Sequence, residues 1–206
     1  MKPLLILDFD GTIANTRDTV IEVMNGLSNE FGFRKIEQKD IEYLRSKKPR
    51  DILEYLGISP FKASFITRKI RKKIKESIAT LEPSKNWLPV LQSLKQKGCH
   101  IGIVTTNTEE NVKKFLHANN LNVFDFFYTA GQIFGKDKII SKISHDIEFS
   151  DIYFIGDEIS DIDAGKKAKV KTIAVSWGYN TIESLQKENP DYMIYSPQEL
   201  EKIIFK

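Results

Sequence analysis

The sequence is poor in the residues that form disulfides and zinc sites. Among 206 residues there is one cysteine, Cys99, and the three histidines, His100, His117 and His145, are scattered along the chain. A single cysteine excludes an internal disulfide, and without a pair of neighbouring cysteines no zinc site is indicated. We therefore expect a protein of a reducing compartment, the cytoplasm.

Long apolar runs and a large excess of one charge are also lacking. The first apolar stretch ends at Asp8, which is too short for a membrane span or for the apolar part of a signal peptide. The formal net charge is only +3, so neither nucleic-acid binding nor membrane association is predicted. In the basic segment 68–75, the isoleucines predict the buried face of a helix, and the lysines and arginines predict its exposed face.

What the sequence does have is an alternation of strand and helix patterns. Short apolar runs predict strands at 4–7, 100–104, 126–129, 152–155, 171–175 and 192–195. Amphipathic segments predict helices between them, at 88–98, 109–119, 136–147, 159–168, 182–187 and 198–204. This alternation predicts an α/β fold, a Rossmann-like core with a parallel sheet between two helical layers.

The stretch from residue 15 to residue 82 breaks the alternation, because it contains helix patterns only. Helices are predicted at 19–33, 41–44, 52–56 and 61–81, with Gly32 ending the first and Pro83 following the last. We therefore divide the chain into an α/β core domain, residues 1–14 and 83–206, and a helical cap domain, residues 15–82. The cap is expected to lie over the ends of the strands.

The first predicted strand leads directly into Asp8-Phe9-Asp10-Gly11-Thr12. Residues two apart in a strand point to the same face, so Asp8 and Asp10 are expected to project together where open α/β sheets bind ligands. Two acids at that place can act as a nucleophile and a proton donor. Such a pair requires one carboxyl group to keep its proton near neutral pH while the other stays ionised. The alternative is a turn with two solvated aspartates.

Three further segments begin or end elements with polar side chains. Thr105 ends a strand, and it either caps the next helix or donates to a phosphoryl oxygen, with Thr106 and Asn107 behind it as candidate substrate-binding residues. Lys136 opens a helix, where a cation opposes the helix dipole and could face an anion.

The last of these segments is Gly156-Asp157-Glu158-Ile159-Ser160-Asp161. Asp157 follows a buried strand, and Asp161 stands one helical turn further on. Clustered carboxylates of this kind suit Mg²⁺, which binds one or two of them together with phosphate oxygens and waters. The alternative is that Asp157 or Glu158 caps the following helix.

In this order, on this α/β pattern, these motifs resemble those of the haloacid dehalogenase superfamily, over essentially the whole chain. The segment 153–179 is most similar to the phosphoglycolate-phosphatase-like branch, and segment 15–82 resembles its helical cap. The resemblance implies that Asp8 is the nucleophile, that Asp10 is the general acid and base, and that Thr105 binds the phosphoryl group.

The resemblance further implies a lysine that neutralises charge, Lys136, although Lys138 is close enough to compete. It implies Mg²⁺ bound by Asp8, the main-chain carbonyl of Asp10 and Asp157, with Asp161 as a direct or supporting acid. The usual proline-containing motif after the lysine is absent here.

The function expected from the resemblance is a Mg²⁺-dependent phosphatase acting on a small phosphorylated metabolite, such as a phosphoglycolate-like compound or a sugar phosphate. A phosphomutase of the same superfamily and a non-catalytic phosphate-binding regulator remain alternatives. Substrate choice is expected from the basic loop 45–50, where Arg45 and Arg50 could meet an anionic group, or could simply be solvated. The sequence does not predict the oligomeric state.

Overall fold

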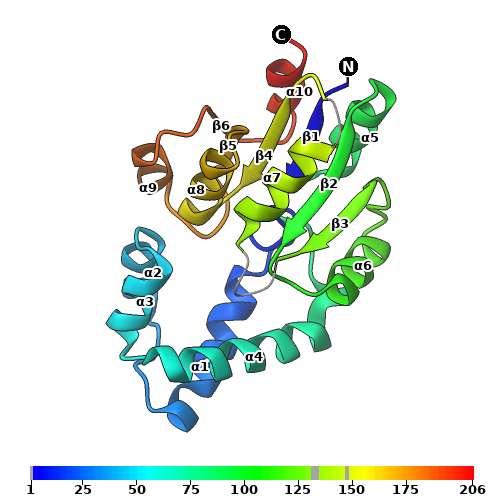
Figure 1. The fold of residues 1–206 in the computed structure, drawn as a ribbon. Helices are drawn as coiled ribbons and strands as arrows, with labels where there is room; N and C mark the ends of the chain where they lie inside the picture. Colours follow the sequence, from blue (N-terminus) through cyan, green and yellow to red (C-terminus); the bar gives the residue numbers. More distant parts are fainter. Residues whose placement is uncertain (1, 131–134, 147–148) are drawn as a thin grey trace.

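Six parallel strands form one sheet at the centre of the protein. The computed structural model describes residues 2–130, 135–146 and 149–206. Within them the strand order is β3-β2-β1-β4-β5-β6, with β1 in the middle (Figure 1). The bounds are Leu4–Leu7 (β1), His100–Thr105 (β2), Phe126–Thr129 (β3), Ile152–Gly156 (β4), Lys171–Val175 (β5) and Tyr192–Ile194 (β6). The predicted Rossmann-like α/β fold class is confirmed.

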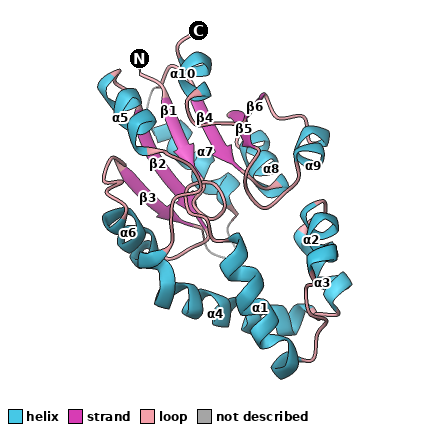
Figure 2. Cartoon of the chain, turned by 180° about the vertical axis from the view of Figure 1, so that it is seen from behind, coloured by secondary structure: helices cyan, strands magenta, loops and turns pink. Residues whose placement is uncertain are grey.

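Helices cover both faces of this sheet (Figure 2). The side chains of β1 alternate between the faces: Leu5 and Leu7 join one apolar cluster, and Leu4 and Ile6 join another. The first cluster includes residues of α5 (Leu88–Gln96), α6 (Glu109–Ala118) and α10 (Glu199–Ile204). The second includes residues of α7 (Lys136–Asp146) and α8 (Ile159–Lys167), and α9 (Ile182–Lys187) packs beside α8. Each side chain of β1 therefore points to one defined face of the sheet along the whole strand.

A separate group of helices lies beyond the carboxyl ends of the strands, while both chain termini lie at the opposite end (Figure 1). Its members are α1 (Arg17–Phe31), α2 (Gln38–Arg45), α3 (Pro49–Leu56), α4 (Pro60–Ser77) and a 3₁₀ turn, Ile78–Thr80. This helical unit has an apolar core of its own, which includes Leu44, Leu56 and Ile66. Gly32 ends α1 in the left-handed conformation, with φ of 64°, as the sequence predicted.

Two short backbone segments connect the helical unit to the sheet. Asn15 N–H donates to the carbonyl of Glu82 over 3.0 Å, and Ser84 N–H donates to the carbonyl of Ile13 over 2.8 Å. The outgoing and returning chains are therefore paired side by side, and they cross together next to the end of β1.

The predicted helix 61–81 differs from the structure at its end. The α-helix stops at Ser77, and the chain continues as the 3₁₀ turn to Thr80. Ile78 is 1% exposed and belongs to the core cluster of the sheet, so tertiary packing rather than Pro83 ends this helix. At the end of the helix predicted over 136–147, Ile147 lies outside the described residues. Among the described helices, none has the length and apolar character needed to cross a bilayer.

We predict that Phe115→Ala lowers the free energy of unfolding by about 3–5 kcal/mol, because its ring is fully buried and its loss leaves a cavity. The ring of Phe115 packs edge-on against Phe9, between the two aspartates of the first motif, with centroids 5.1 Å apart. Urea unfolding followed by circular dichroism measures the change. Phe61→Ala is the control: Phe61 is 75% exposed, and a loss there above about 1 kcal/mol would contradict the burial argument.

Candidate active site

Two aspartates are placed by the central pair of strands. β1 and β4 pair with Leu7 opposite Ile155, and Asp8 N–H continues the ladder by donating to the carbonyl of Ile155 over 2.8 Å. Asp8 therefore follows β1 at the level of Gly156, the last residue of β4, and Asp157 is the next residue after it. Asp8 is 3% exposed and Asp157 is fully buried. The pairing of these two strands thus brings two residues that are distant in the sequence to the same edge of the sheet.

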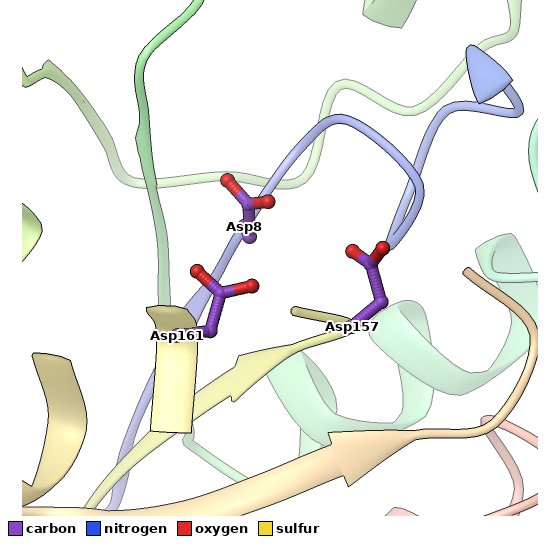
Figure 3. Close-up of side chains that lie close together, drawn as sticks. All are labelled: Asp8, Asp157 and Asp161. Atoms are coloured by element: carbon purple, nitrogen blue, oxygen red, sulfur yellow. The ribbon is translucent and has the colours of Figure 1, made fainter. Parts of the chain in front are cut away.

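Asp161, in the first turn of α8, completes a cluster of three acids. One carboxylate oxygen each from Asp8, Asp157 and Asp161 lie within 4.8 Å of one another. Figure 3 shows the three carboxylates projecting to the same side, beyond the ends of the strands. An all-oxygen donor set of this size suits a hard divalent cation, so the residues present fit the ion that the sequence analysis expected.

Lys136, the first residue of α7, supplies positive charge to the cluster. Its Nζ lies 2.8 Å from Asp8 Oδ1 and 2.6 Å from Asp161 Oδ1. The side chain of Lys136 is 12% exposed, so this charge is largely shielded from water. The unfavourable position of a lysine at a helix start is explained by these contacts. Lys136 rather than Lys138 is thus the lysine that we carry forward.

Burial dominates the electrostatics of the cluster. Burial raises the pKa of Asp8, with Lys136 opposing and the neighbouring acids adding to the rise. Burial and the charges of Asp161 and Glu158 raise the pKa of Asp157. Burial disfavours the charged form of Lys136, but Asp161 and Asp8 outweigh it and raise its pKa. Burial thus raises the pKa of both carboxyls, and the Lys136 ammonium group beside Asp8 favours the ionised form of that carboxyl.

Asp10 has partners different from those of Asp8. Strand β1 ends at Leu7, so the rule that residues two apart share a face does not extend to Asp10. Asn107 Nδ2 lies 3.2 Å from Asp10 Oδ1 and 3.1 Å from Oδ2. Burial raises the pKa of Asp10, while hydrogen bonds from Asn107 and Thr16 oppose the rise.

Thr105 ends β2 and is 2% exposed. Its Oγ1 accepts a hydrogen bond from Asn107 N–H over 3.0 Å. The cap of α6 is instead Thr108, whose side chain accepts from Asn111 N–H, so the alternative that Thr105 caps this helix is wrong. Thr106 is exposed, and together with Lys136 it lines a cavity of about 290 Å³.

The N-cap residue of α8 is Glu158, not Asp157. Glu158 N–H donates to Asp161 Oδ2 over 3.0 Å, which is half of a capping box. Asp157 instead accepts from Thr12 Oγ1 over 2.6 Å and from Tyr179 N–H over 2.7 Å. The alternative that Asp157 is a helix cap is therefore wrong, whereas Asp161 has a structural task in addition to its place in the cluster.

Two glycines allow the backbone to approach Asp157 closely. A Cβ at Gly11 would overlap the Asp157 carboxylate and the Tyr179 ring, and a Cβ at Gly178 would overlap Asp157. Gly11 also has φ of 80°, a backbone conformation that residues other than glycine rarely adopt. The glycine of the first motif is thus required by both the turn and the space around the carboxylate.

The two arginines of the basic loop have different surroundings. Arg45 Nε donates to the carbonyl of Tyr179 over 3.2 Å, and its Nη2 is 3.4 Å from the carbonyls of both Gly178 and Asn180. Asn180 Nδ2 returns a 2.6 Å hydrogen bond to the carbonyl of Arg45. Arg50 is exposed, and its side chain makes no hydrogen bond or ion pair to any described residue. Arg45 therefore fastens the helical unit to loop 178–180, while Arg50 faces solvent.

Comparison with known proteins shows the family to which the chain belongs. The sequence profile of the haloacid dehalogenase-like hydrolases matches residues 5–175. The chain belongs to this family. It is 25% identical over 199 residues to a phosphoglycolate phosphatase of Synechococcus elongatus, covering 95% of this chain and 94% of that protein. It is 25% identical over 218 residues to the pyrophosphatase PpaX of Bacillus mycoides, covering 97% and 95%. The crystal structure of a predicted phosphatase from Clostridium acetobutylicum superposes with a TM-score of 0.82 at 21% identity, covering 100% of this chain and 99% of that one.

Several residues of this family member's site were not singled out from the sequence. Thr12 and Tyr179 both donate hydrogen bonds to Asp157. Thr12 ends the first motif, and Tyr179 ends the segment 153–179. Asn111 contacts Asn107 behind Asp10. The available signal was its spacing, because Asn111 lies four residues before Phe115, on the apolar face of the same helix.

We predict that Mg²⁺ raises the melting temperature, and that it does so more at about pH 8 than at about pH 5. Raised pKa values at Asp8 and Asp157 mean that the folded protein keeps protons which the unfolded chain releases near pH 4. Without metal, this contribution to stability is present at acidic pH and is lost as pH rises through the folded pKa values. Because Mg²⁺ competes with these protons, its effect grows with pH, to about 2.7 kcal/mol at a hundredfold excess over Kd.

Thermal unfolding with excess Mg²⁺ and with EDTA measures this effect. Asp157→Asn is the control, since it keeps the size of the side chain and removes a negative oxygen. An equal Mg²⁺ effect in Asp157→Asn, or one that does not change with pH, would contradict metal binding at the cluster.

We predict that Arg45→Ala lowers the free energy of unfolding by about 1–3 kcal/mol, because three partly buried carbonyls lose a charged donor. Arg50→Ala is the matched control, five residues away, and should change stability by less than about 0.5 kcal/mol. Chemical unfolding of both variants is the measurement. Equal effects would show that the contacts of Arg45 do not stabilise the protein.

Proposed function

We propose that this protein is a Mg²⁺-dependent phosphatase, which hydrolyses a small-molecule phosphate monoester through a phosphorylated Asp8. The observation that carries the proposal is the environment of the Asp8 carboxylate. It is buried, forms an ion pair with Lys136, and clusters with two further acids at the strand ends. The names of the relatives, phosphoglycolate phosphatase and pyrophosphatase, support cleavage of a phosphate bond.

In the first step, an Asp8 oxygen attacks phosphorus and the bond from phosphorus to the ester oxygen breaks. Asp10 gives its proton to the leaving oxygen. In the second step, Asp10 takes a proton from a water molecule, which attacks phosphorus and releases Asp8 and inorganic phosphate. The separate partners of Asp8 and Asp10 support this division of labour.

Positive charge lets an anionic carboxylate approach an anionic phosphate. Lys136 supplies one charge at Asp8, and we assign to the Thr105 hydroxyl, at the end of the neighbouring strand β2, the binding of a phosphoryl oxygen. When bound, Mg²⁺ supplies further neutralisation. Asp8, Asp157 and the main-chain carbonyl of Asp10 would hold it. Because Asp161 already accepts from Lys136 and Glu158, we assign it to supporting this site.

The helical unit, residues 15–82, acts in this proposal as a cap domain over a core formed by residues 1–14 and 83–206. A cap that closes over the strand ends excludes water from the phosphoenzyme. A cavity of about 180 Å³ lies beside Arg17, Arg45 and Tyr179. Its other walls are apolar side chains of the cap region: Val20, Ile21, Met24, Ile36, Ile41, Leu44 and Ile52. We assign contact of the cap with a compact metabolite to this cavity; Arg45 lines it, whereas the candidate ligand Arg50 does not.

We predict that Asp8→Asn lowers the rate of phosphate release by about 10⁴-fold or more, because the amide is a poor nucleophile. Release of inorganic phosphate from p-nitrophenyl phosphate and from a panel of sugar phosphates and short phosphorylated acids is measured with Mg²⁺ and with EDTA. Asp18→Asn is the control, since its carboxylate is 74% exposed and pairs with Arg17. Wild-type activity in Asp8→Asn would overturn the proposal. So would isomerisation of a sugar phosphate without phosphate release, which would indicate a mutase.

A further inference from the structure

The amide of Asn107 has one orientation that satisfies its neighbours. Its Oδ1 accepts from Thr108 N–H over 2.8 Å and from Asn111 Nδ2 over 2.9 Å. Its Nδ2 is thereby directed at both oxygens of Asp10. Rotating the amide by half a turn would place an acceptor against the Asp10 carboxylate and a donor against two donors. The hydrogen bond from Asn111 Nδ2 therefore helps to keep the Nδ2 group of Asn107, rather than its Oδ1, facing Asp10.

Asn111 is itself placed so that it can do little else. It is 1% exposed, and its Oδ1 accepts no hydrogen bond from the described residues. An unpaired buried oxygen has a cost, and a leucine of similar size would avoid it. Reversing the Asn111 amide would bring its oxygen against Asn107 Oδ1, so the observed orientation is the one that makes a hydrogen bond. The side chain is thus poorly suited to stabilising the helix and well suited to donating to Asn107.

We propose that Asn111 is a positioning residue for the proton transfer by Asp10, acting through the amide of Asn107. This inference rests on the proposed phosphatase function. A proton reaches the leaving oxygen efficiently only from a carboxyl group held within hydrogen-bond reach of it. Without the donor of Asn111, Asn107 Oδ1 keeps only the hydrogen bond from Thr108 N–H, so the amide that orients the Asp10 carboxyl is held less firmly. The nucleophile Asp8 keeps its contact with Lys136.

The test uses two substrates that differ in their need for a proton. The leaving group of an alkyl phosphate must be protonated, whereas that of 2,4-dinitrophenyl phosphate leaves as a stable anion. In Asn111→Leu, kcat/KM should fall about 10-fold or more for the alkyl phosphate and less than about 3-fold for the dinitrophenyl ester. Asn111→Asp, which accepts where Asn111 donates, should show the same selective loss. Asp10→Asn is the benchmark and should show a larger loss of the same kind.

Asn119→Leu is the matched control, at the C-cap of the same helix. It removes an asparagine whose Nδ2 bonds the carbonyls of Leu81 and Phe115, away from Asp10, and should leave the ratio of the two kcat/KM values unchanged. Circular dichroism and thermal unfolding establish that each variant folds. If Asn111→Leu does not fold, Asn111→Asp provides the test.

A loss of equal size with both substrates, or no loss, would overturn the role of Asn111. Wild-type protein that cleaves neither ester would overturn the proposed function instead. A selective loss in Asp10→Asn without one at Asn111 would leave the proposed function standing and reject this inference alone.

Discussion

The structure depends on the burial of several carboxylates around one lysine. Two like charges about 4 Å apart repel each other by about 4 kcal/mol at an effective dielectric constant of 20. Asp8, Asp157 and Asp161 lie within such distances, and only Lys136 brings an opposite charge into direct contact with two of them in the part of the chain that is described. Such an arrangement is costly unless bound protons or a divalent cation neutralise the remaining negative charge. A fold that retains it is therefore suited to binding phosphate together with metal.

The position of the helical unit is linked to this cluster through one loop. Tyr179 N–H holds the Asp157 carboxylate, and the carbonyls of the same loop accept from Arg45. Asn180 ties the loop to α8 as well, because its Oδ1 accepts from Ile159 N–H over 2.9 Å. A change in the contacts of Arg45 would therefore reach the backbone that holds Asp157. The position of the helical unit and the geometry of the acids are therefore linked through this loop.

The two aspartates of the first motif are separated by the path of the chain. Phe9, between them, is fully buried against Phe115, and its carbonyl accepts from Ile13 and Ala14 in a tight turn. The turn leaves Asp8 on the side of α7 and α8, and directs Asp10 toward the start of α6. One carboxylate thus meets a lysine and the other meets an amide. This difference in partners is the physical basis for giving them different tasks.

The sequence by itself determined the order of strands and helices and the residues that follow each strand. Local patterns were sufficient for this, since the apolar runs at Phe126–Thr129 and Lys171–Val175 match β3 and β5 residue for residue. Only the tertiary structure decided which polar side chains meet. Asn107 reaches Asp10 across 97 residues of sequence, and Thr12 reaches Asp157 across 145, so no local spacing records these contacts. The end of α4 was decided in the same way, because the burial of Ile78 depends on the sheet rather than on its neighbours in the chain.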